Sequence, residues 1–153
     1  MKVAIVGRKG IEITERLKEA INREISRLVQ DGADVFYFCD IEDGFGNLCY
    51  DALEKYNVRR VLVRAYYEML DEDTAEYKIE FTENKFFPED LQDYLTVYIK
   101  PEKHIISLCN VLLTCCKVSC DYYFKDKSQA GSLLAVLYAR RKGKKIINIY
   151  DML

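Results

Sequence analysis

Hydrophobic positions recur along this chain with two spacings, which separate strands from helices. Short apolar runs with the length and composition of buried strands occupy Lys2–Val6, Asp34–Cys39, Arg60–Arg64, Asn110–Cys116 and Lys145–Tyr150. After the first run, Leu17, Ile21, Ile25 and Leu28 recur at helical spacing. This periodicity predicts a helix from about Ile13 to Gln30, which Asp31-Gly32 would end.

The intervening segments complete an alternation of strands and helices. Asp40–Asn47 is predicted to be a turn-rich acidic loop and Leu48–Tyr56 a short helix, and a loop with one irregular strand is expected between Tyr66 and Pro88. A helix would follow each of the two prolines, Pro88 and Pro101, and the second would run through Ser107. We expect a three-layer α/β/α Rossmann-like fold with a mostly parallel sheet of about five strands, formed by residues 1–153 as one domain.

Composition and charge exclude several classes of partner. Half of the residues are hydrophobic, 31% are charged, the net charge is -2 and the sequence pI is about 5.6. We therefore do not expect nucleic acid or an anionic membrane as a partner. No apolar run approaches the roughly 20 residues that span a bilayer, and the first strand is too short for a signal peptide. These features predict a cytoplasmic protein.

The cysteines offer no obvious metal site. The chain has 6 cysteines, at positions 39, 49, 109, 115, 116 and 120, and no C-x-x-C pair. Its single histidine is His104. Adjacent thiols on a strand point to opposite faces, so Cys115 and Cys116 would not share one zinc ion. We expect reduced, buried thiols, with no metal and no cofactor. Structural zinc and redox sensing remain the alternatives.

Two strand tips carry candidate ligand residues. Because the carboxyl ends of parallel strands meet at one edge of a sheet, the loops that follow them line ligand sites. Gly7 could let a ligand approach the backbone, and Arg8 offers a fork of donors to phosphate; a plain turn is the alternative. Asp40 ends the second strand, and Asp40 or Asp51 would receive ribose hydroxyls. Their alternatives are a turn around Gly44 and Gly46 and a helix cap at Asp51.

Two further segments carry candidate ligand residues, and a third, basic segment is interpreted differently. Arg64 and Tyr66 could hold phosphate and base, or they could simply pack a loop. Ser128-Gln-Ala-Gly131-Ser132 precedes the last predicted helix, whose backbone N–H groups could bind phosphate; a plain N-cap is the alternative. The basic run Arg140–Lys145 is interpreted as a solvated helix end, with nucleic-acid binding as the alternative.

Taken together, these motifs resemble the SLOG superfamily, the Rossmann-like group of the Smf/DprA proteins and the LOG enzymes, and most nearly its small bacterial DUF1273/YpsA-like branch. The matching segments are Ile5-Val-Gly-Arg8, Asp40 with Gly44-Phe-Gly46 and Asp51, Val63-Arg-Ala65, and Leu112-Leu-Thr114 with Gly131-Ser132. The resemblance implies binding of a nucleotide or nucleotide-derived molecule at the carboxyl edge, by a bacterial or phage sensor or sequestering protein. The implied ligand residues are Gly7, Arg8, Asp40, Gly44, Asp51, Arg64, Tyr66, Thr114, Gly131 and Ser132.

One departure from the family favours binding over catalysis. LOG phosphoribohydrolases carry Pro-Gly-Gly-x-Gly-Thr-x-x-Glu before this helix, whereas Gln129-Ala-Gly131-Ser132 lacks most of those glycines and Ala135 replaces the glutamate. The enzymatic alternative is N-glycosidic hydrolysis with Asp51, Glu54 or Asp121 as the carboxylate. A structural or partner-binding domain with a vestigial cleft is the third hypothesis, and homo-oligomerisation stays open.

Overall fold

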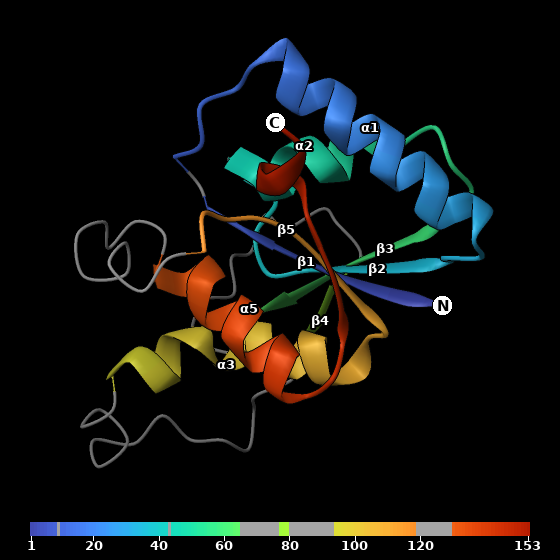
Figure 1. The fold of residues 1–153 in the computed structure, drawn as a ribbon. Coiled ribbons are helices and arrows are strands. Elements are labelled where there is room, and N and C mark those ends of the chain that lie inside the picture. The colour runs from blue at the N-terminus through green and yellow to red at the C-terminus, as the bar shows by residue number, and fades with distance from the viewer. Residues whose placement is uncertain (9, 43, 65–76, 80–93, 119–129) are drawn as a thin grey trace.

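The strands form one sheet in which every pairing is parallel. The computed structural model describes residues 1–8, 10–42, 44–64, 77–79, 94–118 and 130–153 (Figure 1). The 6-stranded sheet has the order β4-β3-β2-β1-β5-β6. Its strands are β1 (Lys2–Gly7), β2 (Val35–Phe38), β3 (Arg59–Arg64), β4 (Tyr77–Ile79), β5 (Val111–Cys115) and β6 (Lys145–Asn148). The predicted α/β class is confirmed, and β4 is the strand expected between Tyr66 and Pro88.

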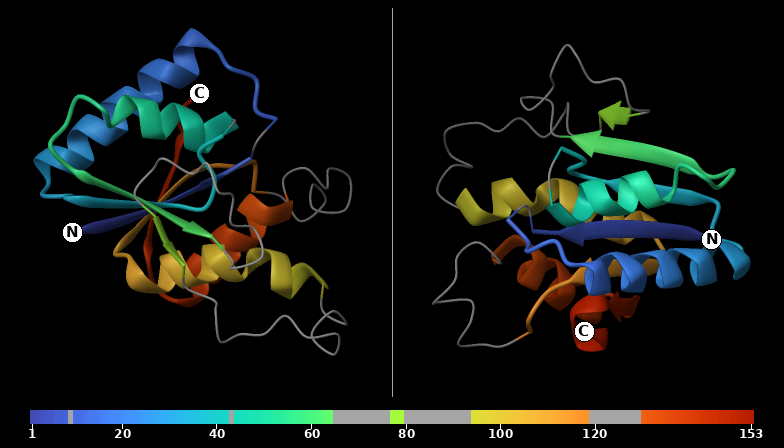
Figure 2. Two further views of the ribbon diagram at one scale, coloured as in Figure 1. Left: turned by 180° about the vertical axis from the view of Figure 1, so that it is seen from behind. Right: turned by 90° about the horizontal axis from the view of Figure 1, so that it is seen from above.

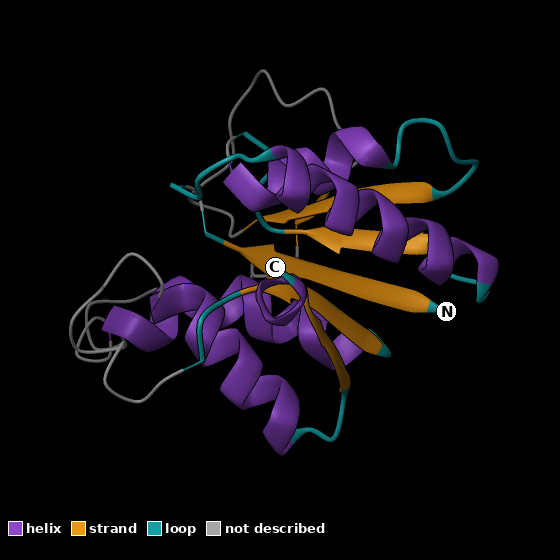
Figure 3. Ribbon diagram, turned by 45° about the horizontal axis from the view of Figure 1, so that its top comes forward, coloured by secondary structure: helices purple, strands orange, loops and turns teal. Residues whose placement is uncertain are grey.

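Helices cover both faces of this sheet, which confirms the three-layer arrangement. The helices α1 (Glu15–Gln30) and α2 (Gly44–Ala52) lie on one face together with the 3₁₀ helix η4 (Ile149–Met152). The helices α3 (Tyr94–Leu108) and α5 (Ala130–Arg141) lie on the other. Figures 1 and 3 show the sheet between these two layers, and Figure 2 shows the same layers from behind and from above.

The central strands are buried on both faces, as the apolar runs predict. All five residues of β5 are buried, and its side chains alternate between two separate core clusters. Leu113 and Cys115 pack under α1, whereas Leu112 and Cys116 pack under α5. The two adjacent thiols therefore point to opposite faces, as expected for neighbours on a strand.

The first helix follows its sequence signals closely. Thr14 is the N-cap, and its Oγ1 accepts a hydrogen bond from the Leu17 backbone N–H at 3.1 Å. Leu17, Ile21, Ile25 and Leu28 are all buried against the sheet. The helix ends at Gln30, and Gly32 has a φ of 97°, a left-handed conformation that favours glycine after a helix.

Two predicted boundaries were wrong, and packing explains the first. The helix expected over Leu48–Tyr56 is α2, which begins at Gly44 and ends at Ala52, so the second half of the predicted acidic loop is helical. Phe45 is completely buried, and its backbone N–H donates to the Arg8 carbonyl at 3.2 Å. Burying this ring under the sheet requires the helix to start earlier than the local turn residues indicate.

The second wrong boundary concerns Pro101. It lies inside α3, although the sequence predicted a helix that begins after it. An interior proline removes one helical hydrogen bond and costs roughly 3 kcal/mol. Ile105 and Ile106, in the following turn, are buried against the sheet and α5. Their burial offsets a cost that local propensity alone makes prohibitive.

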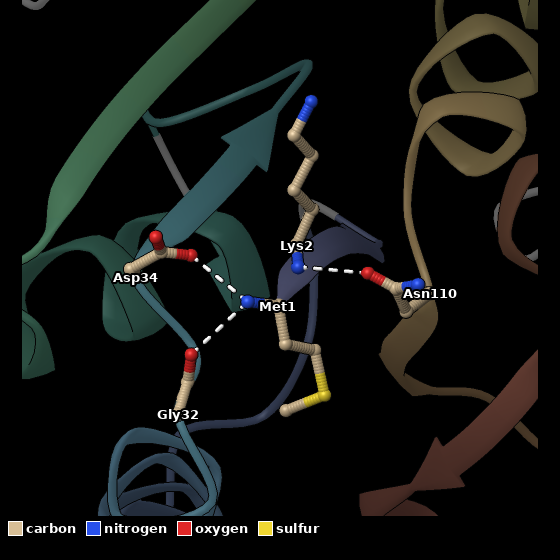
Figure 4. Close-up of polar contacts among 5 residues, drawn as sticks. All are labelled: Met1, Lys2, Gly32, Asp34 and Asn110. Carbon is tan, nitrogen blue, oxygen red and sulfur yellow. Dashed lines mark hydrogen bonds and ion pairs between the residues drawn. The ribbon is translucent and has the colours of Figure 1, made fainter.

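Polar contacts join β1 to both neighbours at the amino edge of the sheet (Figure 4). The Met1 amino group lies 3.0 Å from Asp34 Oδ1 and donates to the Gly32 carbonyl at 3.0 Å. The Lys2 backbone N–H donates to Asn110 Oδ1 at 3.0 Å, at the start of β5. A hydrogen bond from the amino terminus, helped by its charge, lowers the pKa of the exposed Asp34 carboxyl. These contacts align the beginnings of β2, β1 and β5.

Close packing at the other end of β1 determines the residue at position 7. A Cβ atom built on Gly7 would lie 2.6 Å from Phe45 Cβ and closer still to its ring. The Phe45 side chain cannot move away easily to make room for this atom, because it is completely buried. Gly7 is therefore required by the contact between β1 and α2, whether or not a ligand binds near it.

This packing predicts that Gly7→Ala destabilises the fold. We expect a loss of about 1–3 kcal/mol in the free energy of unfolding, because the added methyl group overpacks a rigid core. Gly131→Ala is the matched control, since a Cβ atom there meets nothing within 4 Å. Urea denaturation monitored by circular dichroism measures both variants. Equal stability of the two variants would contradict this explanation.

Candidate functional site

The order of the strands places a crevice at the carboxyl ends of β1 and β5. Strands β2, β3 and β4 follow β1 toward one edge of the sheet, whereas β5 and β6 lie on its other side. Open parallel sheets bind ligands where the strand order reverses in this way. Gly7 pairs with Cys115 across this boundary, so the loops after β1 and β5 begin side by side (Figure 2).

Arg8 lies beside the end of β5. Its charge acts on both neighbouring thiols, lowering the pKa of Cys115 and Cys116 against the larger effect of burial. The residue is half-buried, and its carbonyl is occupied by the Phe45 N–H. The structure thus puts a guanidinium at the crevice, where the sequence predicted one.

A cavity of about 240 Å³ opens next to Arg8 on the α1 side of the sheet. Its walls come from the loop after β1, the beginning of α1, the end of β5 and the segment after β6; they are Arg8, Ile11, Glu12, Thr14, Leu17, Cys115, Tyr150 and Leu153. Sequence reasoning missed Tyr150 and Leu153. The sequence predicted a strand that runs through Tyr150, but β6 ends at Asn148 and Tyr150 lies in η4, just beyond the carboxyl end of the strand.

The first turn of α5 lies on the opposite face of the sheet, beside the end of β5. Gly131 has open space around its Cα, and Ser132 is buried and hydrogen-bonds the Cys116 sulfur. Thr114 is completely buried on the face of β5 that α5 covers, and its Oγ1 has no hydrogen-bond partner within the described residues. Ser132 is thus part of the helix and not its cap. Ser128, the other predicted cap, lies outside the described residues.

Asn148 connects the ends of β5 and β6. Its Oδ1 accepts from the Cys116 backbone N–H at 2.9 Å, and its Nδ2 donates to the Cys116 carbonyl at 2.7 Å. Its Oδ1 also accepts from the Tyr150 N–H at 3.2 Å, so one buried carboxamide holds both loops that border the cavity. Sequence reasoning missed this residue, because an asparagine in an apolar strand gives no signal of a distant partner.

Burial raises the pKa of four described thiols, of which Cys115 and Cys116 lie beside the crevice. Burial raises the pKa of Cys115 to about 11 and that of Cys109 to about 12, and it raises the pKa values of Cys49 and Cys116 as well. A neutral thiol is neither a strong nucleophile nor a metal ligand. Among the described residues, no group of three or more His, Cys, Asp or Glu side chains could hold a metal ion.

The tip of β2 lies next to β1 but is largely structural. Asp40 Oδ1 accepts from the Glu42 N–H at 2.9 Å, which closes the turn before α2. Gly44 begins that helix with a φ of 70°, and a Cβ atom on Gly46 would overlap the Asp40 carbonyl oxygen. Asp40 also lines a pocket of about 30 Å³ together with Gly7 and with Glu102 from α3.

Two predicted site residues, Asp51 and Glu54, are not brought to the crevice. Asp51 lies near the carboxyl end of α2, which runs back toward the amino edge, and neither Asp51 nor Glu54 caps its start. The Tyr50 backbone carbonyl accepts from Arg60 Nη1 at 3.2 Å near the start of β3, which places this end of α2 at the amino edge. Asp51 and Glu54 are exposed there.

Three predicted residues are described in part or not at all. Arg64 is the last residue of β3, and its backbone pairs with Ile79, two strands away from Gly7. That separation is about 10 Å across the sheet. The Arg64 side chain lies outside the described part of the structure, and so do the residues Tyr66 and Asp121.

Comparisons with known proteins show the fold. No protein-family model matches the chain, and no curated protein matches its sequence. The molybdenum cofactor carrier protein MCP from Chlamydomonas reinhardtii is similar in structure, with a TM-score of 0.59 and 9% identity over 95% of this chain and 73% of that one. The protein TM1055 has a TM-score of 0.58 and 14% identity over 95% and 71%. A second structure titled as the Chlamydomonas Moco carrier has a TM-score of 0.56 and 9% identity over 97% and 75%.

These likenesses define a Rossmann-like α/β protein. The shared architecture covers nearly the whole of this chain and most of each neighbour. No helix in the described part of the chain is long and apolar enough to cross a membrane.

The Asn148 contacts predict that Asn148→Ala destabilises the carboxyl edge. The substitution leaves the buried Cys116 N–H and carbonyl without partners, and we expect a loss of about 1–3 kcal/mol in the free energy of unfolding. Asn22→Ala is the control, because Asn22 is exposed and donates one hydrogen bond within α1. Chemical denaturation measures both, and an equal effect would mean that the Asn148 contacts contribute nothing.

Proposed function

We propose that this chain is a SLOG-type binding protein for a nucleotide or nucleotide-derived small molecule, which it senses or sequesters. The observation that carries this proposal is the position of Arg8. The guanidinium lies at the reversal of strand order, beside a cavity of about 240 Å³ and next to the end of β5. A crevice of this kind is where open α/β sheets bind phosphorylated ligands.

The crevice offers two means of holding phosphate. Arg8 can bind two phosphate oxygens through its planar fork. The first turn of α5 adds backbone N–H groups and the positive end of the helix dipole, with open space at Gly131. Thr114 supplies a buried hydroxyl on the same face, so its Oγ1 is a further candidate contact.

The protein also offers candidate contacts for the base and the ribose of a nucleotide. Tyr150, which is 42% exposed, and Leu153 provide an aromatic and apolar wall for a base at the cavity beside Arg8. Asp40 remains the candidate for ribose, because it follows the neighbouring strand β2 and lines the small pocket at Gly7. Arg64 and Tyr66 would extend this surface along the sheet edge.

Two further arguments support binding rather than turnover. The structural neighbour from Chlamydomonas is named as a carrier of a cofactor, a function that requires small-molecule binding. In addition, Ala135 stands where the LOG enzymes carry their glutamate, and it is a buried residue on the core face of α5. The proposed protein is a single cytoplasmic domain of the DUF1273/YpsA-like branch, from a bacterium or phage.

One observation favours N-glycosidic hydrolysis as a second candidate function. Asp40 and Glu102 line the same pocket beside Gly7, so two carboxylates stand at the carboxyl edge although Asp51 and Glu54 do not. A pair of this kind could supply an acid and a base. Release of free base from a panel of nucleoside monophosphates would establish this activity, and its absence would leave binding alone.

Native mass spectrometry of freshly purified protein is the first experiment. A retained metabolite would appear as a defined mass increment, and the same spectrum gives the number of subunits. Calorimetric titration with nucleoside monophosphates, nucleoside diphosphates, NAD and ADP-ribose then measures affinity. If no phosphorylated compound binds and none is retained, the proposed function is wrong.

The site predicts that Arg8→Ala weakens binding of a phosphorylated ligand by roughly 1.5–3 kcal/mol, the range for hydrogen bonds to charged groups. Arg64→Ala is expected to act alike, and Arg→Lys should recover only part of the loss, because an ammonium lacks the planar fork. The melting temperature should barely change. Arg16→Ala, at an exposed position of α1, is the control. Unchanged affinity with a large drop in melting temperature would mean that these arginines are structural.

A second prediction concerns the start of α5. Gly131→Val should impair ligand binding while the protein stays folded, because the branched side chain enters the open space that a phosphate would occupy. Gly131→Ala should show a smaller loss of affinity. Calorimetry measures binding, and circular dichroism verifies the fold. Wild-type affinity in Gly131→Val would place the phosphate elsewhere.

A further inference from the structure

The outer surface of α3 and α5 carries a groove that is distinct from the cavity beside Arg8. It has a volume of about 300 Å³ and is lined by Lys103 of α3 and by Leu134, Leu137, Tyr138 and Arg141 of α5. Leu137 is 47% exposed, although it is a large apolar side chain on a helix whose other face is buried. We call this feature the α3–α5 groove; Figure 1 shows the two helices side by side below the sheet.

Tyr138 forms the centre of the groove and is held in place by its neighbours. Its hydroxyl lies 2.9 Å from the Ser107 hydroxyl of α3. Three cations surround its ring: Arg141 Cζ lies 5.4 Å from the ring centroid, and the Nζ atoms of Lys103 and Lys142 each lie 5.6 Å from it. The groove therefore has an apolar floor and a rim of cations.

Acidic residues do not balance this charge along α5. The chain has no Asp or Glu from Ser128 to Tyr150, although it carries Arg140, Arg141, Lys142, Lys144 and Lys145 in that stretch. On α3, Glu102 neighbours Lys103 in the sequence but lines the pocket with Asp40 on the sheet side. A chain with a net charge of -2 thus carries a run of cations after Tyr138, of which Arg141 lines the groove and Lys142 lies near the Tyr138 ring.

The combination of leucines and cations selects among the partners that a basic surface can have. Nucleic acid would use the cations and the tyrosine ring, but the half-buried Leu134 and the exposed Leu137 offer nothing to a phosphate backbone. A second copy bound two-fold at the groove would bring its own Lys103 and Arg141 against the same cations. An amphipathic helix with acidic flanks matches both the floor and the rim.

We propose that the α3–α5 groove is a docking site for an acidic amphipathic helix of a partner protein. A leucine-type side chain of the partner enters between Leu134, Leu137 and Tyr138, and its carboxylates face Lys103 and Arg141. The groove shares no lining residue with the cavity beside Arg8, and its residues on α5 extend from about one turn after Gly131 to about 15 Å along the helix, at 1.5 Å per residue. This inference does not rest on the proposed ligand.

The test uses the whole protein and a fluorescein-labelled, glutamate-rich peptide whose leucines recur at i, i+3, i+4 and i+7. A scrambled peptide of the same composition and a single-stranded oligonucleotide are the competing probes. Fluorescence anisotropy measures affinity at two salt concentrations. Two pairs of exposed positions provide matched variants: Arg141→Glu with Arg140→Glu as its control, and Leu137→Ser with Ile13→Ser as its control.

We expect Arg141→Glu and Leu137→Ser to weaken peptide binding about tenfold or more, and both controls to stay within about threefold of the parent. Equal losses of peptide affinity in Arg141→Glu and Arg140→Glu would overturn the proposal, and so would equal binding of the scrambled peptide. Either result would mean that the peptide is held by non-specific electrostatic attraction. An oligonucleotide that binds tighter than the peptide and is insensitive to Leu137→Ser would likewise overturn the proposal. A dimer that Leu137→Ser dissociates in sedimentation velocity would identify a second copy as the occupant and also overturn it.

Discussion

The rest of the structure depends on the burial of β1 between two neighbouring strands and two helical layers. Every N–H and C=O group of a buried strand needs a partner, and β1 finds them in β2 on one side and β5 on the other. The chain must therefore cross both faces of the sheet, with α1 on one and α3 and α5 on the other. The reversal of strand order at β1 follows from this arrangement, and so does the crevice at its carboxyl end.

The same crowding determines which parts of the crevice are open to a ligand. Phe45 fills the space against Gly7, and the Asp40 carbonyl fills the space against Gly46, so these two glycines serve contacts between β1, the β2 tip and α2. Open space remains beside Gly131 and in the cavity next to Arg8. A glycine at a strand tip is thus evidence of a close approach, but the approaching group here is the protein itself.

Helix α5 contributes to both surfaces that we assign. Its first turn faces the crevice beside Thr114, whereas its last turns carry Leu137, Tyr138 and Arg141 to the α3–α5 groove. The buried side chains between them, such as Val136 and Ala139, hold the helix against the sheet. The buried face fixes the orientation of the helix, and that orientation decides which residues reach solvent as a docking surface.

Local patterns in the sequence determined the α/β class, the helix α1, the buried strands β1 and β5, the position of Arg8 after a strand and that of Gly131 at a helix start, because periodicity and turn chemistry act over a few residues. Only the tertiary structure decided that α2 begins at Gly44, that α3 continues through Pro101, and that α2 carries Asp51 away from the crevice. It alone joined Asn148 to Cys116 and set Glu102 beside Asp40. Such pairs lie far apart along the chain, and they meet because of strand order, register and helix direction, which no local window of sequence contains.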